Sequence, residues 1–220
     1  MASGYRYFVF YKPYGYLSQF TDEGGHPGLA RLGLFPPQVY PLGRLDHDSE
    51  GLLLLTDNPA INKKLLNPRY RHRRTYWVQV EGSIHPEALE QLQRGVDIRI
   101  NKQTHRTQPA QAQVLNPPPP LPERDPPIRY RASIPTSWLA LTLTEGKNRQ
   151  VRRMTAAVGF PTLRLVRFSM EGLQLDKLAV GEARELPETE FLAKLGLNTT
   201  QPNGQADYKP KKSRRTGPRR

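Results

Sequence analysis

The chain has 220 residues, no cysteine, and 33 Lys and Arg against 20 Asp and Glu, which gives a net charge of +13. This length can bury a sizeable core, as one domain or as two intimate subdomains. The lack of cysteine excludes disulfides and thiolate metal sites and fits a reducing cytoplasm. The five histidines do not fall at ligand spacing, so no metal is expected. With no signal peptide or membrane span in view, the excess charge favours nucleic acid as the partner.

Two strands are predicted in the first third of the chain. Residues 5–11 are dense in aromatic and β-branched side chains, which is typical of a strand. Residues 29–34 are a short helical candidate inside a stretch rich in Gly and Pro. The four leucines at 52–55 have the length of a strand that is buried on both faces. After them, Asp57 is expected to cap a short helix with Pro59 in its first turn.

A basic run at residues 69–74 leads into a strand at residues 75–81. Alternation along this strand places Tyr76 on the same face as two valines, and an inward tyrosine is more often core packing than chemistry. A run of arginines is usually a solvated face. Here the arginines are interleaved with Tyr70 and His72, an arrangement that suits contacts to backbone phosphates.

The second half predicts a helix at residues 86–94, a strand at 138–144, a helix at 148–158 and a strand at 162–168. Between them, residues 116–127 contain seven prolines and are expected to form a stiff exposed loop that faces RNA.

The helix predicted at residues 148–158 has a buried apolar stripe. At about 100° per residue, Arg152 lies at the border of that stripe, whereas Arg149 and Arg153 point away from it. Arg152 can therefore reach a site at the edge of the core.

The stretch LGRLDHDSEGLLLLTD at residues 42–57 places two carboxylates, Asp46 and Asp48, in a polar turn just before the leucine strand. A rigid strand holds such a carboxylate better than a free loop does. The alternative is that both are ordinary turn formers, because Asp readily bonds its own following backbone.

This stretch closely resembles the signature of the RNA pseudouridine synthases, in the branch that contains the small-subunit enzyme RsuA and several large-subunit enzymes. Four other segments resemble motifs of the same family: YKPYGYLS, RRTYWVQVEG, EGKNRQVRRM and TLRLVRF. The resemblance implies an α+β fold, with a long mixed and mostly antiparallel sheet, a central cleft for the active site and peripheral helices. It also implies that no cofactor is needed.

By this resemblance, Asp46 is the catalytic carboxylate, Tyr76 lies against the target base, and Leu163 lines the base pocket. The Arg of QVR, here Arg152, would pair with Asp46 and keep it ionised. Arg44 could fill the space left by a flipped base. The residues expected to bind RNA are Arg44, Arg71, Arg73, Arg74, Lys147, Arg149 and Arg153.

The motifs span residues 5–190, so residues 1–196 are expected to be a catalytic domain, divided near residue 70 into subdomains 1–70 and 71–196. Relatives carry an N-terminal S4 RNA-binding domain that is not expected here. Residues 197–220 are interpreted as a basic, disordered tail that could grip phosphates in its place. Within the branch, the chain looks most like a large-subunit enzyme, which implies a monomer that acts on 23S ribosomal RNA in the cytoplasm.

Two other functions remain open from the residues alone. A glycoside hydrolase could use Asp46 and Asp48 as its carboxylate pair, although nothing else in the sequence supports a sugar groove. A non-catalytic protein that binds ribosomal RNA or assists ribosome assembly would suit the basic surface equally well.

Overall fold

The computed structural model describes residues 4–128 and 133–197, and the basic tail therefore lies outside the described residues. One long sheet carries the fold, in the order β11-β1-β3-β9-β4-β8-β7, with β2 on β3 and β10 on β9. Its strands are β1 (Tyr7–Lys12), β2 (Tyr40–Pro41), β3 (Glu50–Thr56), β4 (Arg74–Glu81), β7 (Gln111–Val114), β8 (Thr136–Leu143), β9 (Thr162–Met170), β10 (Leu173–Gln174) and β11 (Ala183–Leu186). The pair β3 and β9 is parallel and the other pairs are antiparallel, which confirms the expected mixed sheet.

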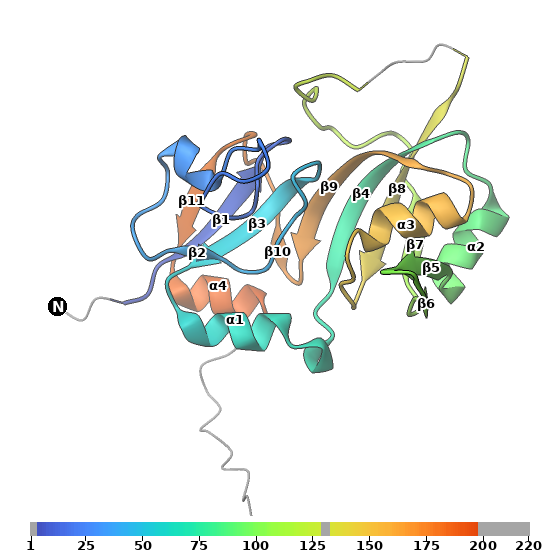
Figure 1. Cartoon of the computed structure of the whole chain (residues 1–220). Coiled ribbons are helices and arrows are strands. Elements are labelled where there is room, and N and C mark those ends of the chain that lie inside the picture. Colours follow the sequence, from blue (N-terminus) through green and yellow to red (C-terminus); the bar gives the residue numbers. More distant parts are fainter. Residues whose placement is uncertain (1–3, 129–132, 198–220) are drawn as a thin grey trace, which may run out of the picture.

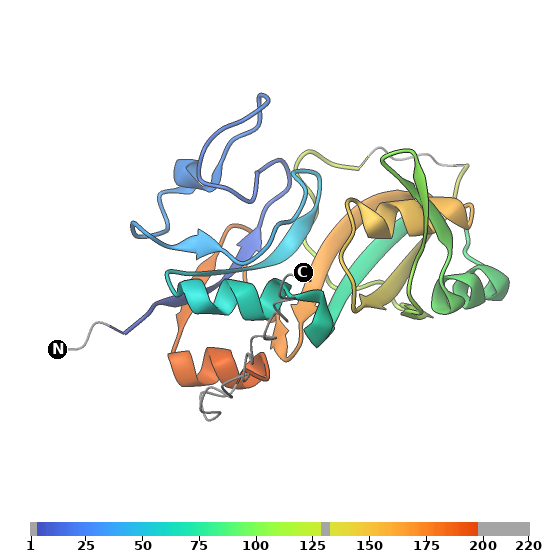
Figure 2. The same ribbon diagram turned by 60° about the horizontal axis from the view of Figure 1, so that its bottom comes forward.

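Helices cover the two halves of this sheet separately (Figure 1). In the first half, α1 (Pro59–Leu66) and α4 (Glu188–Lys194) share one hydrophobic cluster with β1 and β3 (Figure 2). In the second half, α2 (Pro86–Arg94) and α3 (Gln150–Ala157) pack with β4 and β8. The remaining short elements are η1 (Leu29–Leu32), η2 (Pro68–Tyr70) and the hairpin of β5 (Asp97–Ile100) and β6 (Gln103–Arg106).

The end of the chain returns to the first half of the sheet. Strand β11 pairs with β1, and the ring of Phe191 in α4 packs at a tilt against Tyr7, with ring centroids 4.9 Å apart. Elements from beyond residue 70, namely β10, β11 and α4, therefore pack with the first 70 residues.

Strand β3 is the centre of the core, as the leucine run predicts. All of its residues are buried. Leu52 and Leu54 belong to the cluster with α1 and α4, whereas Leu53 and Leu55 pack on the opposite face with phenylalanines of β1. Because both faces are covered, the strand holds the polar turn that precedes it rigidly.

Gly51 allows β3 and β9 to lie close together at the start of their parallel pair. Its φ is 106°, a conformation that side chains rarely adopt, and a Cβ added there would lie 2.4 Å from the carbonyl oxygen of Arg167. Gly51 is the register partner of Arg167. The glycine thus brings the Asp46 turn next to β9.

Two helix starts differ from the sequence prediction. Asn58 caps α1, because its side chain accepts a hydrogen bond from the Ala60 N–H, whereas Asp57 accepts one from the Arg6 N–H. Helix α3 begins at Gln150, two residues later than predicted, and Arg149 before it has a left-handed φ of 51°. In the part of the chain that is described, no helix has the length and apolar character needed to cross a membrane.

The proline-rich segment is largely exposed but is tied to the sheet at a few points. Pro122 accepts a hydrogen bond of 2.9 Å from Arg164 Nη1, and Leu121 packs against the first-half core. The guanidinium of Arg124 lies 4.2 Å from the ring centroid of Tyr14, in the turn after β1. The segment thus links β7 in the second half to the first half, and most of residues 116–127 are exposed, as predicted for this loop.

Candidate active site

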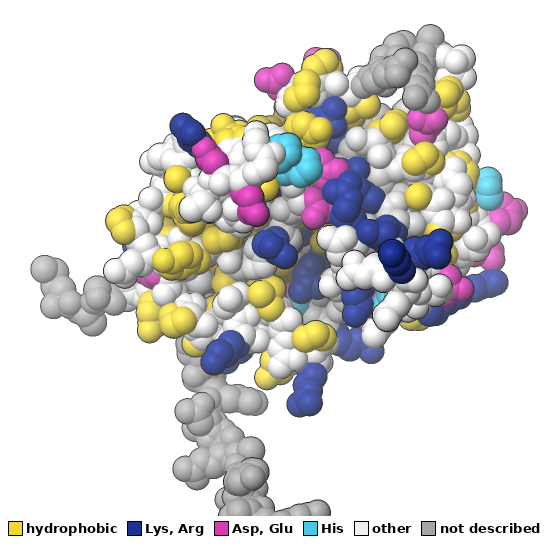
Figure 3. Space-filling model, in the orientation of Figure 1, with side chains coloured by type: hydrophobic (Ala, Val, Ile, Leu, Met, Phe, Trp, Pro, Cys, Tyr) yellow, Lys and Arg dark blue, Asp and Glu magenta, His cyan; other side chains and the backbone are white. Residues whose placement is uncertain are grey.

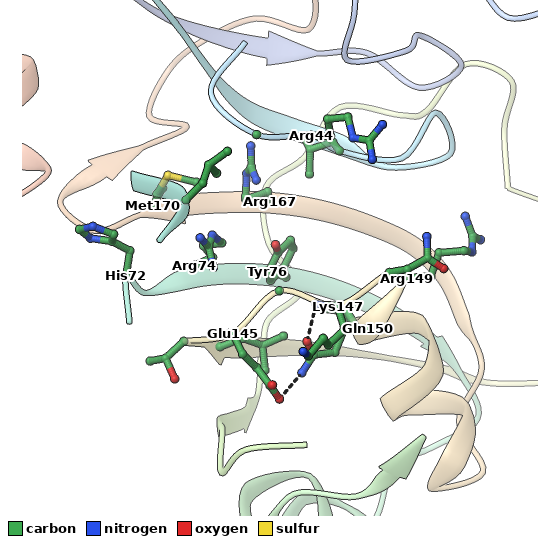
Figure 4. A pocket seen from close by; sticks show the side chains of 18 of the residues that line it. Arg44, His72, Arg74, Tyr76, Glu145, Lys147, Arg149, Gln150, Arg167 and Met170 are labelled. Atoms are coloured by element: carbon green, nitrogen blue, oxygen red, sulfur yellow. Dashed lines mark hydrogen bonds between the residues drawn. The ribbon is translucent and has the colours of Figure 1, made fainter. Parts of the chain in front are cut away.

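A cavity of about 560 Å³ opens between the two halves of the sheet. The turn before β3 forms one wall, β4 and β9 form the floor, and the segment between β8 and α3 forms the opposite wall (Figure 4). Seven of the residues singled out from the sequence line it: Arg44, Asp46, Arg71, Arg74, Tyr76, Lys147 and Arg149. Four others, Arg73, Arg152, Arg153 and Leu163, are not part of this wall.

Backbone hydrogen bonds hold the turn that carries Asp46. The Ser49 N–H donates to the Asp46 carbonyl oxygen over 3.0 Å, and the Gly15 N–H donates to that of His47 over 2.8 Å. The buried hydroxyl of Ser18 bonds to both the N–H and the carbonyl oxygen of Leu45. Part of the motif around Gly15 therefore supports the carboxylate from behind, without entering the cavity.

Arg149 is the arginine next to Asp46. Its Nη1 lies 3.6 Å from Asp46 Oδ2, and it binds Asp48 through two hydrogen bonds of 3.0 and 2.6 Å. Arg152 instead contacts Asp48, with its Nε 3.3 Å from Oδ2 and its Nη2 donating to the Asp48 carbonyl oxygen. The predicted direct pair of Arg152 with Asp46 is wrong in this structure, as is the expectation that Arg149 points away.

The left-handed backbone of Arg149 explains this exchange. A helical position 149 would face solvent, whereas a residue just outside the helix turns its side chain back over the cavity. Arg152 stays at the border of the helix's buried face, as predicted, and braces the backbone of the turn through Asp48.

Asp48 is a structural anchor. Burial disfavours its charge, but the bonds from Arg149 and the charge of Arg152 outweigh this effect and lower the pKa of Asp48. A glycoside hydrolase needs one carboxyl group that stays protonated to donate a proton. A doubly paired Asp48 cannot serve as that acid, and it does not line the cavity as Asp46 does, so the two do not face one substrate as a carboxylate pair.

Tyr76 faces the cavity beside a buried arginine that the sequence reading missed. Arg167 on β9 is the register partner of Tyr76 on β4, and both side chains project from the floor (Figure 4). Arg167 is 3% exposed, and its Nε donates to the Leu52 carbonyl oxygen over 2.7 Å. Burial lowers the pKa of Arg167 from its ordinary value. Its Nη2 has no hydrogen-bond partner among the described residues.

Two hydroxyls in opposite walls of the cavity also lack partners in the described part of the chain, Ser49 Oγ and Thr144 Oγ1. Buried polar atoms are normally paired, so each of these atoms retains an unused hydrogen bond behind the surface of the cavity. Leu165, rather than Leu163, supplies the apolar side of the floor. A planar base fits a site that has an apolar side chain on its floor and polar side chains in its walls.

The mouth of the cavity is basic. Figure 3 shows Lys and Arg side chains gathered at the centre of this face, next to acidic side chains. Arg73 is instead engaged with Glu171, and Arg153 with the carbonyl oxygens of Arg99 and Asn148. These two arginines, for which phosphate binding is predicted, thus do not line the cavity. The cations that do line its mouth are Arg44, Arg71, Arg74 and Lys147.

Comparisons with known proteins agree with this geometry. A family model described as RNA pseudouridylate synthase matches residues 6–157. The chain therefore belongs to the RNA pseudouridylate synthase family, whose members are isomerases. A solved structure titled "Crystal structure of pseudouridylate synthase" has a TM-score of 0.70 at 27% identity, over 87% of this chain and 74% of that one.

Within the family, the chain is similar to proteins named ribosomal large subunit pseudouridine synthase E. One from Xanthomonas axonopodis pv. citri (strain 306) is 55% identical over 170 residues, which are 76% of this chain and 87% of that protein. One from Vibrio vulnificus (strain CMCP6) is 51% identical over 178 residues, 81% of this chain and 74% of that protein. The ribosomal small subunit pseudouridine synthase A of Escherichia coli (strain K12) is 35% identical over 192 residues, 86% of this chain and 73% of that protein. The resemblance read from the motifs is thus confirmed.

Proposed function

We propose that this protein converts a uridine of large-subunit (23S) ribosomal RNA to pseudouridine, as a monomer in the cytoplasm and without a cofactor. The observation that carries the proposal is the meeting of Asp46, Tyr76 and Arg149 in one cavity with a basic mouth. The similarity to large-subunit synthases supports the choice of RNA.

The reaction breaks the bond between uracil N1 and ribose C1′, rotates the base, forms a bond from C5 to C1′, and releases the C5 proton while N1 gains one. Asp46 acts at the ribose, as the nucleophile or as the base, and is held for this role by Arg149. Tyr76 lies against the base and assists removal of the C5 proton. A uridine in paired RNA must flip to reach the floor, and Arg44 at the rim fills the space that it leaves.

The proposal is tested with ribosomal RNA transcripts labelled with tritium at uridine C5, because each turnover releases that proton to water. Large-subunit transcripts should release tritium in proportion to time and enzyme, and small-subunit transcripts should not. Release from small-subunit transcripts alone would overturn the choice of RNA. Tight binding of large-subunit RNA without any release would favour the non-catalytic alternative.

Replacing Arg149 by methionine should lower kcat on the order of a hundredfold, because a misplaced catalytic group costs about that much. Binding of RNA should weaken far less, since several other cations line the mouth. Single-turnover tritium release at saturating RNA measures kcat apart from affinity. Arg94→Met is the matched control, because Arg94 pairs with Glu90 on α2 and does not line the cavity. Equal losses in the two variants would contradict the positioning role of Arg149.

A further inference from the structure

A second hollow, of about 700 Å³, adjoins the cavity and is not used by the reaction described above. It lies between β2, the loop before η1 and the exposed side of α1, and six of its lining residues are Phe20, Tyr40, Pro41, Arg44, Asn62 and Leu66. We refer to it as the Tyr40 groove. It shares Gly43, Arg44 and Leu66 with the wall of the cavity.

The groove is lined by two aromatic side chains, and one of them is largely exposed. Tyr40 is 65% exposed, although it sits in a strand. The ring of Phe20 meets it edge to face, with centroids 6.3 Å apart and planes at 83°. Leu66 at the boundary with the cavity is 43% exposed. Large apolar side chains that remain exposed side by side indicate a binding surface.

The groove is flanked by one carboxylate and by several cations: Glu23 accepts a hydrogen bond of 2.9 Å from the lining residue Gln19. Helix α1 contributes exposed Lys63 and Lys64 in its last turn and has no acidic residue. Arg44 stands at the boundary between groove and cavity. Exposed hydrophobic side chains over the region of β2 appear on the same face as the central Lys and Arg side chains (Figure 3). Aromatic rings flanked by cations are the arrangement by which proteins hold single-stranded nucleic acid, because every base has a face that can stack.

We infer that the Tyr40 groove binds a second, unpaired nucleobase of the same RNA, a near neighbour of the uridine that enters the cavity, with Tyr40 stacking on its face. This inference rests on the proposed function and adds to it a part of the substrate. The two hollows meet at Arg44, so one RNA strand can extend from the cavity into the groove. Flipping one nucleotide disrupts the stacking of its neighbours, and the groove takes up one of the bases released in this way.

The test is a cycle of two changes, one in the protein and one in the RNA. Tyr40→Ala and Tyr40→Phe are each combined with large-subunit RNA fragments in which one abasic nucleotide replaces successive positions on either side of the modified uridine. Tyr40→Ala should raise the Kd about five- to a hundredfold, the range expected from stacking of one base. Tyr40→Phe keeps the ring and should stay within about threefold of wild type. The rate at saturating RNA should be unchanged, since Tyr40 does not line the cavity.

One flanking position should be the base that stacks on Tyr40. RNA that is abasic there should bind the wild-type protein as weakly as intact RNA binds Tyr40→Ala, and combining the two changes should weaken binding little further. Tyr5→Ala is the matched control, because Tyr5 is also exposed, at 52%, and lines neither hollow. Circular dichroism and the thermal midpoint confirm that each variant is folded.

Three results would overturn the inference: Tyr40→Ala that binds RNA within twofold of wild type, losses that simply add at every abasic position, or an equal loss in Tyr5→Ala. Failure of the proposed function is a separate outcome. In that case the wild-type protein releases no tritium from large-subunit RNA. The coupling between Tyr40 and one base is measured by Kd and does not depend on tritium release, so the two failures can be told apart.

Discussion

Asp46→Asn should show no detectable isomerisation while its affinity for ribosomal RNA stays within about threefold of wild type, because phosphate contacts supply most of the binding. The substitution keeps the shape of the side chain and the backbone hydrogen bonds of the turn. It removes the charge that lies 3.6 Å from Arg149 and the group that acts at the ribose.

Tritium release over several hours and RNA binding should be measured on the same preparation, to separate chemistry from capture. Asp48→Asn is an informative comparison, because Asp48 anchors Arg149 and Arg152 but lies outside the wall of the cavity. It should lower the rate without abolishing it. A purified Asp46→Asn protein that still turns over would remove Asp46 from its assigned role.

The second large effect concerns stability and involves the buried pair of Glu50 and Arg164. Their side chains are 3% and 6% exposed, and Arg164 donates two hydrogen bonds, of 2.9 and 2.8 Å, to the carboxylate. Replacing Arg164 by methionine leaves the Glu50 carboxylate buried without its partner and should lower the free energy of unfolding by about 3–5 kcal/mol. Urea unfolding of the purified protein measures this loss.

Two comparison variants show whether burial of the charge is the cause. Glu50→Met combined with Arg164→Met removes both charges and should recover much of the lost stability, since a buried pair can often be replaced by apolar residues. Arg6→Met breaks an exposed pair with Glu185 and should change stability far less. A double variant that is less stable than Arg164→Met would contradict this explanation.

The same pair links the stability of the fold to the site. Glu50 follows the Asp46 turn directly, and Arg164 also holds the carbonyl oxygen of Pro122 in the proline-rich segment. A single buried guanidinium thus joins β3, β9 and that segment behind the cavity.

The elements that the sequence predicts well are those with local signals. The leucine run of β3 predicts a strand buried on both faces, and Asp46 lies in the turn just before it. The alternation of β4 predicts that Tyr76 shares the inward face with Val78 and Val80. Helix α2 begins and ends at the predicted residues because Pro86 and Gly95 mark its ends.

The parts that could not be predicted depend on tertiary contacts. An arginine in a strand reads as solvent-facing, and Arg167 becomes buried only because β3 packs against β9. Arg149 takes the place next to Asp46 because its backbone is left-handed, with a φ of 51°, and a non-glycine residue rarely adopts that conformation, so the sequence does not signal it. The proline-rich segment is held by Arg124 and Arg164, through contacts over long sequence separations.

The most direct test of the account is to map pseudouridines at nucleotide resolution in ribosomal RNA from cells that have the gene, lack it, or carry it as Asp46→Asn. We expect a defined pseudouridine in the large-subunit RNA to be present with the wild-type gene and absent in the other two strains, with the small-subunit RNA unchanged. Identical maps in all three strains, or a site that persists with Asp46→Asn, would contradict this expectation.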